Sequence, residues 1–435
     1  MRTTSSLLLA LCLLPALSRA DVLTVDDDGG ADFTDIQSAV DAALDGDVVL
    51  VKAGSYAGFS IQSKSVSVVA RQGDSVSLAS GVAVRDVGPS DEVTLVRLSV
   101  AGSHGPLSVK YGLDVADCVG SVRALNCTFT GATADPNECN DFIYVPYSGL
   151  VCGYYSGWLG VRVENSDRIA LAGCVVRGGS GLTFPPGAFG SGKGALIEES
   201  AVAMYNCVVE GGDGAFGLLG GGQGGVGLEL QGQCSIFDDT RLFASGTIIR
   251  GGDGGNSGGD PSAQGGANGA GIFVTACTEV EVSGATIEAG DPGMSQLGAI
   301  GYAFDDVMVS INGSFADTGR SARTLQGVVP VDDGDTLALT YRGEPGDLAV
   351  LAISGQPDLV VEPSLFVGAL AVGQGILRIQ GLIGPSGELG KNIPIDVLGP
   401  GEESLTVYLQ GIFVDGALNV ITGSFKDVVI LAPGL

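Results

Sequence analysis

Short stretches of alternating apolar and other residues recur along the middle of the chain, and each ends in glycine. Their spacing varies between 29 and 47 residues, which is too uneven for a helical repeat array. Strands of constant length joined by loops of variable length indicate a solenoid. Six stretches, RLSVAGS, NCTFTGA, GCVVRGG, NCVVEGG, GTIIRGG and GATIEAG, begin at Arg97, Asn126, Gly173, Asn206, Gly246 and Gly284.

A second short strand precedes each of these stretches. Examples are VTLVRL from Val93 and VAMYNC from Val202, in which apolar residues alternate with a period of two. Gly, Asn, Asp and Ser separate the strands, and no pattern of a crossover helix lies between them. The sequence therefore predicts an all-β parallel β-helix, with coils stacked about 4.8 Å apart.

The residue three positions after the cysteine of each stretch, or after its equivalent, tests this stacking. The set is Ala101, Thr130, Arg177, Glu210, Arg250 and Glu288. Its last four members alternate in charge, so a parallel ladder would place each Arg beside a Glu, whereas like charges in register would repel. A structural ladder is favoured over a track for a charged ligand.

The predicted β-helix spans residues 21–312 and begins with a short capping helix at about residues 34–44. Thr34 and Gln37 form a capping-box pattern at its start, and the following residues give it one apolar face. Such a helix would cover the open end of the solenoid, which otherwise exposes its core.

Residues 1–20 have the features of a signal peptide. Arg2 precedes an apolar run from Leu7, and Ser18 and Ala20 fit the small-x-small pattern of a cleavage site after Ala20. No other segment reaches the roughly 18 apolar residues of a membrane span. We therefore expect a protein that is secreted or displayed on the cell surface.

The charge of the chain limits its partners. With 49 acidic and 21 basic residues, the formal net charge is −28 at pH 7. Nucleic acid is excluded, because binding to its phosphates depends on Lys and Arg. Anionic membranes and polyanionic glycans are disfavoured for the same reason, unless a divalent cation intervenes.

Eight cysteines follow the predicted cleavage site, an even number that indicates disulfides in an oxidising compartment. The open alternative is an inward stack of unpaired cysteines that pack as small apolar residues. The expected pairs are Cys118 with Cys127, Cys139 with Cys152, Cys174 with Cys207 and Cys234 with Cys277.

The N-terminal segment contains the pattern DG..DF.TIQ.AV..A..GD.V.V..G.Y, matched at most positions from Asp28 to Tyr56. This pattern resembles the start of secreted right-handed parallel β-helix proteins of the pectin-lyase-like superfamily. The resemblance implies the right-handed fold. It implies no single activity, because the same segment begins pectin esterases, lyases and proteins of no known reaction.

Residues 328–435 read as strands and turns and predict a smaller, β-sandwich-like C-terminal domain. Gly390, Pro394 and the sequence YLQG from Tyr408 resemble a C-terminal module that follows repeats in large secreted bacterial proteins. The resemblance implies a role in surface attachment or packing rather than in chemistry.

No complete catalytic motif of the resembled superfamily is present. The acid pairs Asp238–Asp239 and Asp305–Asp306 are not followed by the histidine of a hydrolase site, since the single histidine, His104, precedes them. Asp213 and Asp253 would leave the stack at the same corner and are weak candidates for a shared calcium site. One Ca²⁺ needs six to eight oxygens, so a role as turn residues is the alternative.

Aromatic residues concentrate in the long insertion between residues 135 and 160. Rings on an outer loop commonly stack on sugars or bury against a partner, and the alternative is that they pack onto the coil. The candidates for carbohydrate binding are Tyr144, Tyr147, Tyr154, Tyr155 and Trp158.

The sequence thus favours a structural or glycan-binding β-helix protein without an evident catalytic motif. Its expected partner is an extracellular polysaccharide or a surface protein. It requires no cofactor, and calcium is the one ion considered. The alternative is a polysaccharide lyase or glycoside hydrolase that acts on an extracellular glycan.

Overall fold

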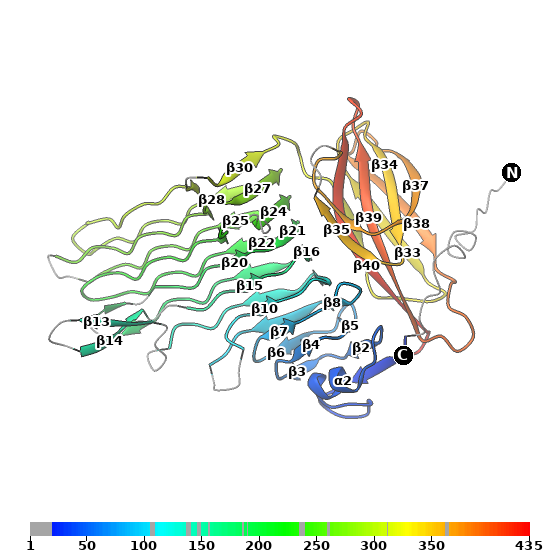
Figure 1. Cartoon of the computed structure of the whole chain (residues 1–435), viewed down its shortest axis with the longest axis horizontal. Coiled ribbons are helices and arrows are strands. Elements are labelled where there is room, and N and C mark those ends of the chain that lie inside the picture. The colour runs from blue at the N-terminus through cyan, green and yellow to red at the C-terminus, as the bar shows by residue number, and fades with distance from the viewer. Residues whose placement is uncertain are drawn as a thin grey trace.

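The larger part of the chain forms three parallel sheets that stack into a β-helix (Figure 1). Neighbouring strands in each sheet come from successive coils. The predicted all-β architecture is therefore confirmed, with one short helix and a C-terminal part of antiparallel and mixed sheets. The computed structural model describes residues 20–104, 109–135, 141–145, 149–154, 157–184, 187–188, 190–234, 240–258, 262–310, 312–361 and 365–435.

The strands of the three sheets are as follows. The long sheet contains β1 (Val22–Val25), β2 (Val48–Val51), β5 (Val66–Ala70), β8 (Glu92–Val96), β11 (Ser121–Leu125), β16 (Arg168–Ala172), β21 (Ala201–Tyr205), β24 (Thr240–Ser245), β27 (Thr278–Ser283) and β30 (Ser314–Asp317). The narrow sheet contains β3 (Gly54–Tyr56), β6 (Val76–Leu78), β9 (Leu98–Ala101), β12 (Thr128–Thr130), β17 (Val175–Arg177), β22 (Val208–Glu210), β25 (Ile248–Arg250) and β28 (Thr286–Glu288). The outer sheet contains β4 (Ser60–Gln62), β7 (Val82–Arg85), β10 (Leu113–Ala116), β15 (Val161–Glu164), β20 (Ala195–Glu198), β23 (Leu228–Gln231), β26 (Ile272–Val274) and β29 (Val307–Val309).

The narrow sheet confirms the register expected from the charge alternation. Arg177 pairs with Glu210, Glu210 with Arg250, and Arg250 with Glu288. The Arg177 guanidinium donates to the Glu210 carboxylate over 2.8 Å. These strands and those of the long sheet are the two predicted per coil, and the outer sheet adds a third, unpredicted strand to each coil.

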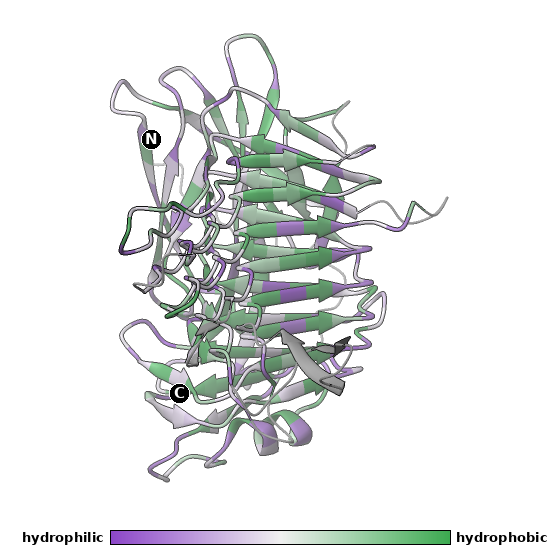
Figure 2. Cartoon of the chain, turned by 90° about the vertical axis from the view of Figure 1, so that its left-hand side faces the viewer, coloured by the Kyte–Doolittle hydropathy of each residue, from purple (hydrophilic) through white to green (hydrophobic). Residues whose placement is uncertain are grey.

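Apolar side chains from alternate positions of all three sheets fill the interior of the β-helix. Figure 2 shows the strands stacked one above another, with hydrophobic and hydrophilic residues alternating along them. On the outer sheet, Val82, Leu113 and Val161 are in register and fully buried. Burial of one such side chain stabilises the fold by about 1.5–3 kcal/mol.

Only one of the expected disulfides is found within the described residues, between Cys234 and Cys277, whose Cα atoms are 5.0 Å apart. The expected pairs Cys118–Cys127 and Cys174–Cys207 are wrong, because all four thiols are free and buried. Cys118 precedes β11 and Cys127 follows it, so the length of a strand, roughly 16 Å, lies between them. Cys139 lies outside the described residues, and its pairing with Cys152 stays a prediction.

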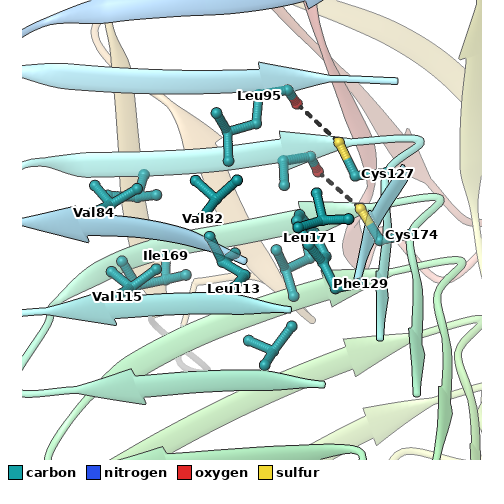
Figure 3. Close-up of a cluster of buried hydrophobic side chains, with 14 of the residues drawn as sticks. Val82, Val84, Leu95, Leu113, Val115, Cys127, Phe129, Ile169, Leu171 and Cys174 are labelled. Atoms are coloured by element: carbon teal, nitrogen blue, oxygen red, sulfur yellow. Dashed lines mark hydrogen bonds between the residues drawn. The ribbon is translucent and has the colours of Figure 1, made fainter. Parts of the chain in front are cut away.

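The stacked cysteines belong to the apolar interior. Cys127 and Cys174 lie in the cluster that surrounds Phe129 (Figure 3). The thiol of Cys127 donates to the carbonyl oxygen of Leu95 over 3.5 Å, and that of Cys174 donates to Ala124 over 3.3 Å. The alternative of an inward stack of unpaired cysteines therefore holds for these residues.

The capping helix α2 (Ile36–Ala42) is shorter than residues 34–44 and begins one residue later than the capping-box pattern suggests. Asp35 is the N-cap, because its carboxylate accepts from the amide of Ser38 over 2.8 Å. The side chain of Gln37 instead accepts from the amide of Ser60 over 2.7 Å and so ties the helix to β4.

The C-terminal strands form a five-stranded, a three-stranded and a two-stranded sheet within the described residues. The β-helical sheets continue to Asp317, and the first C-terminal strand begins at Thr324. The five-stranded sheet contains β32 (Val331–Asp332), β40 (Val420–Leu431), β39 (Ser404–Val414), β34 (Leu348–Ser354) and β37 (Gly375–Leu382). The three-stranded sheet contains β31 (Thr324–Gly327), β33 (Thr336–Arg342) and β38 (Glu388–Pro394). The two-stranded sheet contains β35 (Pro357–Val361) and β36 (Ala369–Val372).

The C-terminal domain packs against the outward face of the long sheet (Figure 1). Tyr205 on β21 lies 5.6 Å from Phe243 on β24 and 5.9 Å from Phe425 on β40, between ring centroids. The Tyr205 hydroxyl donates to the carbonyl of Ala369 over 2.5 Å. One continuous cluster of buried apolar residues thus joins the two parts of the chain.

Glycine-rich loops connect the narrow sheet to the outer sheet and extend together from one side of the β-helix (Figure 1). Their glycines recur at every third position, which is the repeat of a polyproline II helix, and amides of one loop donate to carbonyls of the next. A Cβ atom on Gly252 would lie 1.8 Å from the carbonyl oxygen of Gly212. Within the described residues, no helix is long and apolar enough to cross a membrane.

Candidate functional site

The outward face of the outer sheet carries a strip of ion pairs. Arg85, Asp114 and Arg162 stand on the neighbouring strands β7, β10 and β15. The Arg85 guanidinium donates to Oδ2 of Asp114, and Nη1 of Arg162 lies 3.7 Å from Oδ1 of Asp114. That Oδ1 atom is buried and accepts no hydrogen bond from any described residue. Side chains along a strand alternate between its two faces, and the neighbours of these residues on the same strands point into the core, so the three charged side chains point outward.

The strip continues across the next coils. Arg162 also pairs with Glu164 on its own strand, and its Nε atom lies 3.9 Å from Glu198 on β20. Further along the sheet, Lys193, which lies just before β20, pairs with the buried Glu229 on β23 over 2.8 Å. The pKa of Glu198 is raised, mainly by burial and in part by the charge of Glu164. Each acid on this face therefore has a cation as its neighbour.

A pair of aromatic rings borders the strip at the start of the strands. Trp158 and Tyr111 meet edge to face with ring centroids 5.5 Å apart, and both are partly exposed. Lys110 lies 4.6 Å from the centre of the Trp158 ring, and Arg162 lies 5.5 Å from that of Tyr111. Such contacts between cations and rings are favourable. Burial raises the pKa of Tyr111 above its usual value.

The backbone holds Trp158 in place from both sides. Its amide donates over 2.8 Å to the carbonyl of Ala132, which follows β12 in the same coil, and its carbonyl accepts from the amide of Gly179 in the following coil over 2.8 Å. Gly131 lies so close that a Cβ on it would be 2.0 Å from the Trp158 carbonyl oxygen. The ring therefore projects from a fixed position on the stack.

The structure describes the side chain of one of the five aromatic residues predicted to bind carbohydrate. Tyr144 lies on β13 (Asp141–Val145) and Tyr154 on β14 (Gly149–Tyr154), which form an antiparallel hairpin whose side chains lie outside the described part of the chain. Tyr147 and Tyr155 also lie outside the described residues. Trp158 is thus the one member with a described ring, and the structure brings it beside Tyr111 and Lys110, which the sequence analysis did not select.

The sequence contains a pattern that relates Lys110 to Trp158. A glycine precedes the outer-sheet strands in successive coils, at Gly112, Gly160, Gly194, Gly227 and Gly271. The first and third residues after each of these glycines are apolar. Aligning the coils on these glycines places Lys110 and Trp158 at the same position, three residues before their strands.

Asp213 and Asp253 lie on adjacent loops at the same corner, beside a cavity of about 230 Å³ that Arg177 and Arg250 also line. Oδ1 of Asp213 accepts from the amide of Asp253 over 2.9 Å, and Oδ1 of Asp253 accepts from Asp291 over 2.8 Å. These carboxylates fix the loops to one another. The calcium site stays a prediction.

Acidic side chains also gather at two other places among the described residues. Near the ends of the outer-sheet strands, a cavity of about 260 Å³ is lined by Asp117, Glu164, Glu198 and Glu199, together with polar neighbours. At the N-terminal end of the β-helix, the carboxylate oxygens of residues 26–28 lie within 4.8 Å of one another. The acid pair Asp238–Asp239 lies outside the described residues.

Comparison with known proteins concerns the fold alone. No protein-family model matches the chain, and no curated protein matches it. Its β-helix is similar to a pectate lyase, at 13% identity over 71% of this chain and 82% of the lyase, with a TM-score of 0.30. A pectin methylesterase from Aspergillus niger has 10% identity over 70% of this chain and 88% of the esterase, with a TM-score of 0.26.

A third similar structure is a tailspike protein of an Acinetobacter baumannii bacteriophage, a capsular polysaccharide depolymerase. It has 9% identity over 95% of this chain and 85% of the tailspike, with a TM-score of 0.30. With all three TM-scores this low, the assignment of a parallel β-helix rests on the strand pairing of the chain itself.

Proposed function

We propose that the protein is exported and binds an extracellular polysaccharide on the outward face of the outer sheet, as a structural or glycan-binding protein. The observation that carries this proposal is the fixed pair of Trp158 and Tyr111 beside the strip of Arg162 and Asp114. Partly exposed rings offer a surface on which a sugar ring can stack. Charged groups beside them can exchange hydrogen bonds with its hydroxyls.

Two further features support export and a glycan partner. The disulfide Cys234–Cys277 is typical of an oxidising compartment, as the predicted signal peptide would require. The local cations Lys110, Arg85 and Arg162 make this face suited to neutral or mildly acidic sugars, although the chain as a whole has a net charge of −28.

The alternative is cleavage of the same glycan by a lyase or hydrolase. One observation favours it: Glu198, whose raised pKa would suit a general acid, lies beside Arg162 and close to Glu164. Against it, Arg85 and Arg162 neutralise Asp114, the buried acid at the centre of the strip.

A binding screen of the full chain on purified polysaccharides, with and without Ca²⁺, tests the proposal. Calorimetry would give the dissociation constant, while unsaturated sugars and reducing ends would report cleavage. We expect binding without product, weakened about tenfold by Trp158→Ala, since one aromatic contact contributes roughly 1 kcal/mol or more. Tyr302→Ala, at an exposed ring on a distant loop, is the matched control.

Equal binding by the Trp158→Ala variant would refute the assignment of this face. Product formation that is lost in Glu198→Gln would replace the binding role with the enzymatic one. A dependence on Ca²⁺ that disappears in Asp213→Asn would support the predicted calcium site.

A further inference from the structure

A third cavity, separate from the outer sheet, lies between the β-helix and the C-terminal domain. It has a volume of about 250 Å³ and is bounded on one side by the turns between the long and narrow sheets, and on the other by β31 and β40. Its rim is open, since Gly173 and Gln326 are exposed. The polar residues that line it are Arg97, Asn126, Asn206, Gln326, Ser424 and Lys426.

Two cations line this cavity, and none of the described residues that line it with them is acidic. The Lys426 side chain is among the buried charged groups, with the residue only 8% exposed, and it forms no ion pair or hydrogen bond with the described residues. Nε of Arg97 is buried and also has no hydrogen-bond partner in the described part of the chain. The pKa of Lys426 is lowered, mainly by burial; the charge of Asp427 opposes this shift and that of Arg97 adds to it. Burial lowers the pKa of Arg97 as well.

The acid next to Lys426 is turned away from the cavity. Successive side chains of β40 point to opposite faces, so Ser424 and Lys426 line the cavity while Phe425 and Asp427 contact Arg123. Asp427 uses both carboxylate oxygens on Arg123, from 2.6 to 2.9 Å. A charge buried without a counterion is costly, which favours a ligand of opposite charge at this place.

Neutral donors surround the two cations. Asn126 and Asn206 occupy equivalent turns with φ of 54° and 52°, and Gly173 holds the same position in the coil between them. A Cβ on Gly173 would lie 2.7 Å from the side-chain oxygen of Asn126. The glycine therefore leaves room for the Asn126 side chain, and the two asparagines give this side of the cavity a polar, uncharged lining.

We propose that this cavity binds an oxyanion, the carboxylate, sulfate or phosphate group of a small ligand, between Arg97 and Lys426. The guanidinium offers planar donors and the ammonium a compact positive charge, a combination suited to such a group. The volume admits more than the oxyanion itself, so a sugar acid and a free inorganic ion are the two sources to distinguish.

The test uses the full chain and measures the melting temperature and the dissociation constant with sulfate, phosphate and glucuronate. Chloride at equal ionic strength and glucose are the controls. We expect a saturable rise in melting temperature with at least one oxyanion and none with glucose. Lys426→Met should lose this rise and weaken binding at least tenfold, while melting no lower than the parent chain without ligand.

Arg97→Gln should also weaken binding, and Lys391→Met, an equivalent change elsewhere in the C-terminal domain, should leave it unchanged. Binding of glucuronate but not of inorganic ions would identify a sugar acid as the ligand, and the reverse would identify a free oxyanion. The proposal is overturned if no oxyanion exceeds chloride, or if the Lys426→Met and Arg97→Gln variants bind as the parent chain does. Neither result would bear on the polysaccharide face, which Trp158→Ala tests.

Discussion

The Arg123 guanidinium and the Asp427 carboxylate form a fully buried ion pair between the β-helix and the C-terminal domain. Nε of Arg123 donates to Oδ2 of Asp427 over 2.7 Å, and Nη2 donates to Oδ1 over 2.6 Å. A third donor, Nη1, reaches the carbonyl of Ala371 over 2.5 Å, and the Phe425 ring lies 4.1 Å from the guanidinium. Both side chains have no exposed surface, so the pair depends on the docking of the two parts.

Removal of one partner should therefore destabilise the docked chain severely. Arg123→Met leaves the Asp427 carboxylate buried without a cation, and we expect a loss of about 3–5 kcal/mol in the free energy of unfolding. Denaturant unfolding, followed separately for each part, measures it. Arg177→Met, which removes the exposed pair with Glu210, is the control and should change stability by less than about 1 kcal/mol.

The double variant Arg123→Met with Asp427→Leu distinguishes a buried charge from simple loss of packing. Replacing both members by apolar residues of similar volume should recover most of the stability. If the double variant is as unstable as Arg123→Met alone, the ion pair is not the source of the loss.

A second contact across the same interface should make docking sensitive to pH. The Tyr408 hydroxyl donates to the Glu92 carboxylate, and the pKa of Glu92 is raised, mainly by burial. Because the folded chain favours the protonated acid, the contribution of Glu92 is greatest below the usual pKa of 4.5 and is lost as pH rises through the raised value.

The measurement is the free energy of unfolding from pH 4 upward, for the parent chain and for Glu92→Gln. We expect the difference, variant minus parent, to increase as pH rises above about 4.5, since glutamine carries no charge to bury. Glu279→Gln, at an exposed acid of the long sheet, should show no such trend. A constant difference across this range would contradict the prediction.

The period-two alternation and the repeat made the β-helix and its register predictable. In a parallel stack, residues at equivalent places in the repeat must be neighbours, so the order of charges was enough to pair Arg177 with Glu210. The same reasoning gave the place of Cys174 and Cys207 in the coil but not their bonding. Their side chains point into the core, where packing with apolar residues and S–H donation to carbonyls take the place of a disulfide.

The candidate site was only partly predictable, because its contacts cross loops of irregular length. Lys110 and Trp158 are 48 positions apart in the chain, yet they meet because each lies three residues before an outer-sheet strand. The aromatic composition of the insertion pointed to Trp158. Nothing in local composition singled out Tyr111, whose ring becomes significant only through its neighbours on the stack.

The glycine loops should tolerate no side chain where they touch. In Gly252→Ala the new Cβ would meet the carbonyl oxygen of Gly212, and rigid backbone on both sides prevents relaxation. We expect a loss of more than about 3 kcal/mol in stability, or failure to fold. Gly220→Ala, where the nearest atom would be 3.9 Å away, should stay within about 0.5 kcal/mol. Similar melting temperatures for both variants would contradict this packing.

The buried thiols provide the last prediction. Burial raises the pKa of the Cys118, Cys127 and Cys207 thiols, so little reactive thiolate exists and the core also shields it. An alkylating reagent should therefore leave these residues unmodified in the native chain, and also Cys174, which the core shields equally. It should label all four after unfolding without a reductant. Mass spectrometry of the peptides identifies each site. The disulfide pair Cys234–Cys277 is the internal control, because these residues should be labelled only after reduction. If Cys174 and Cys207 also require reduction, they are bonded in solution and the stacked-thiol arrangement is wrong.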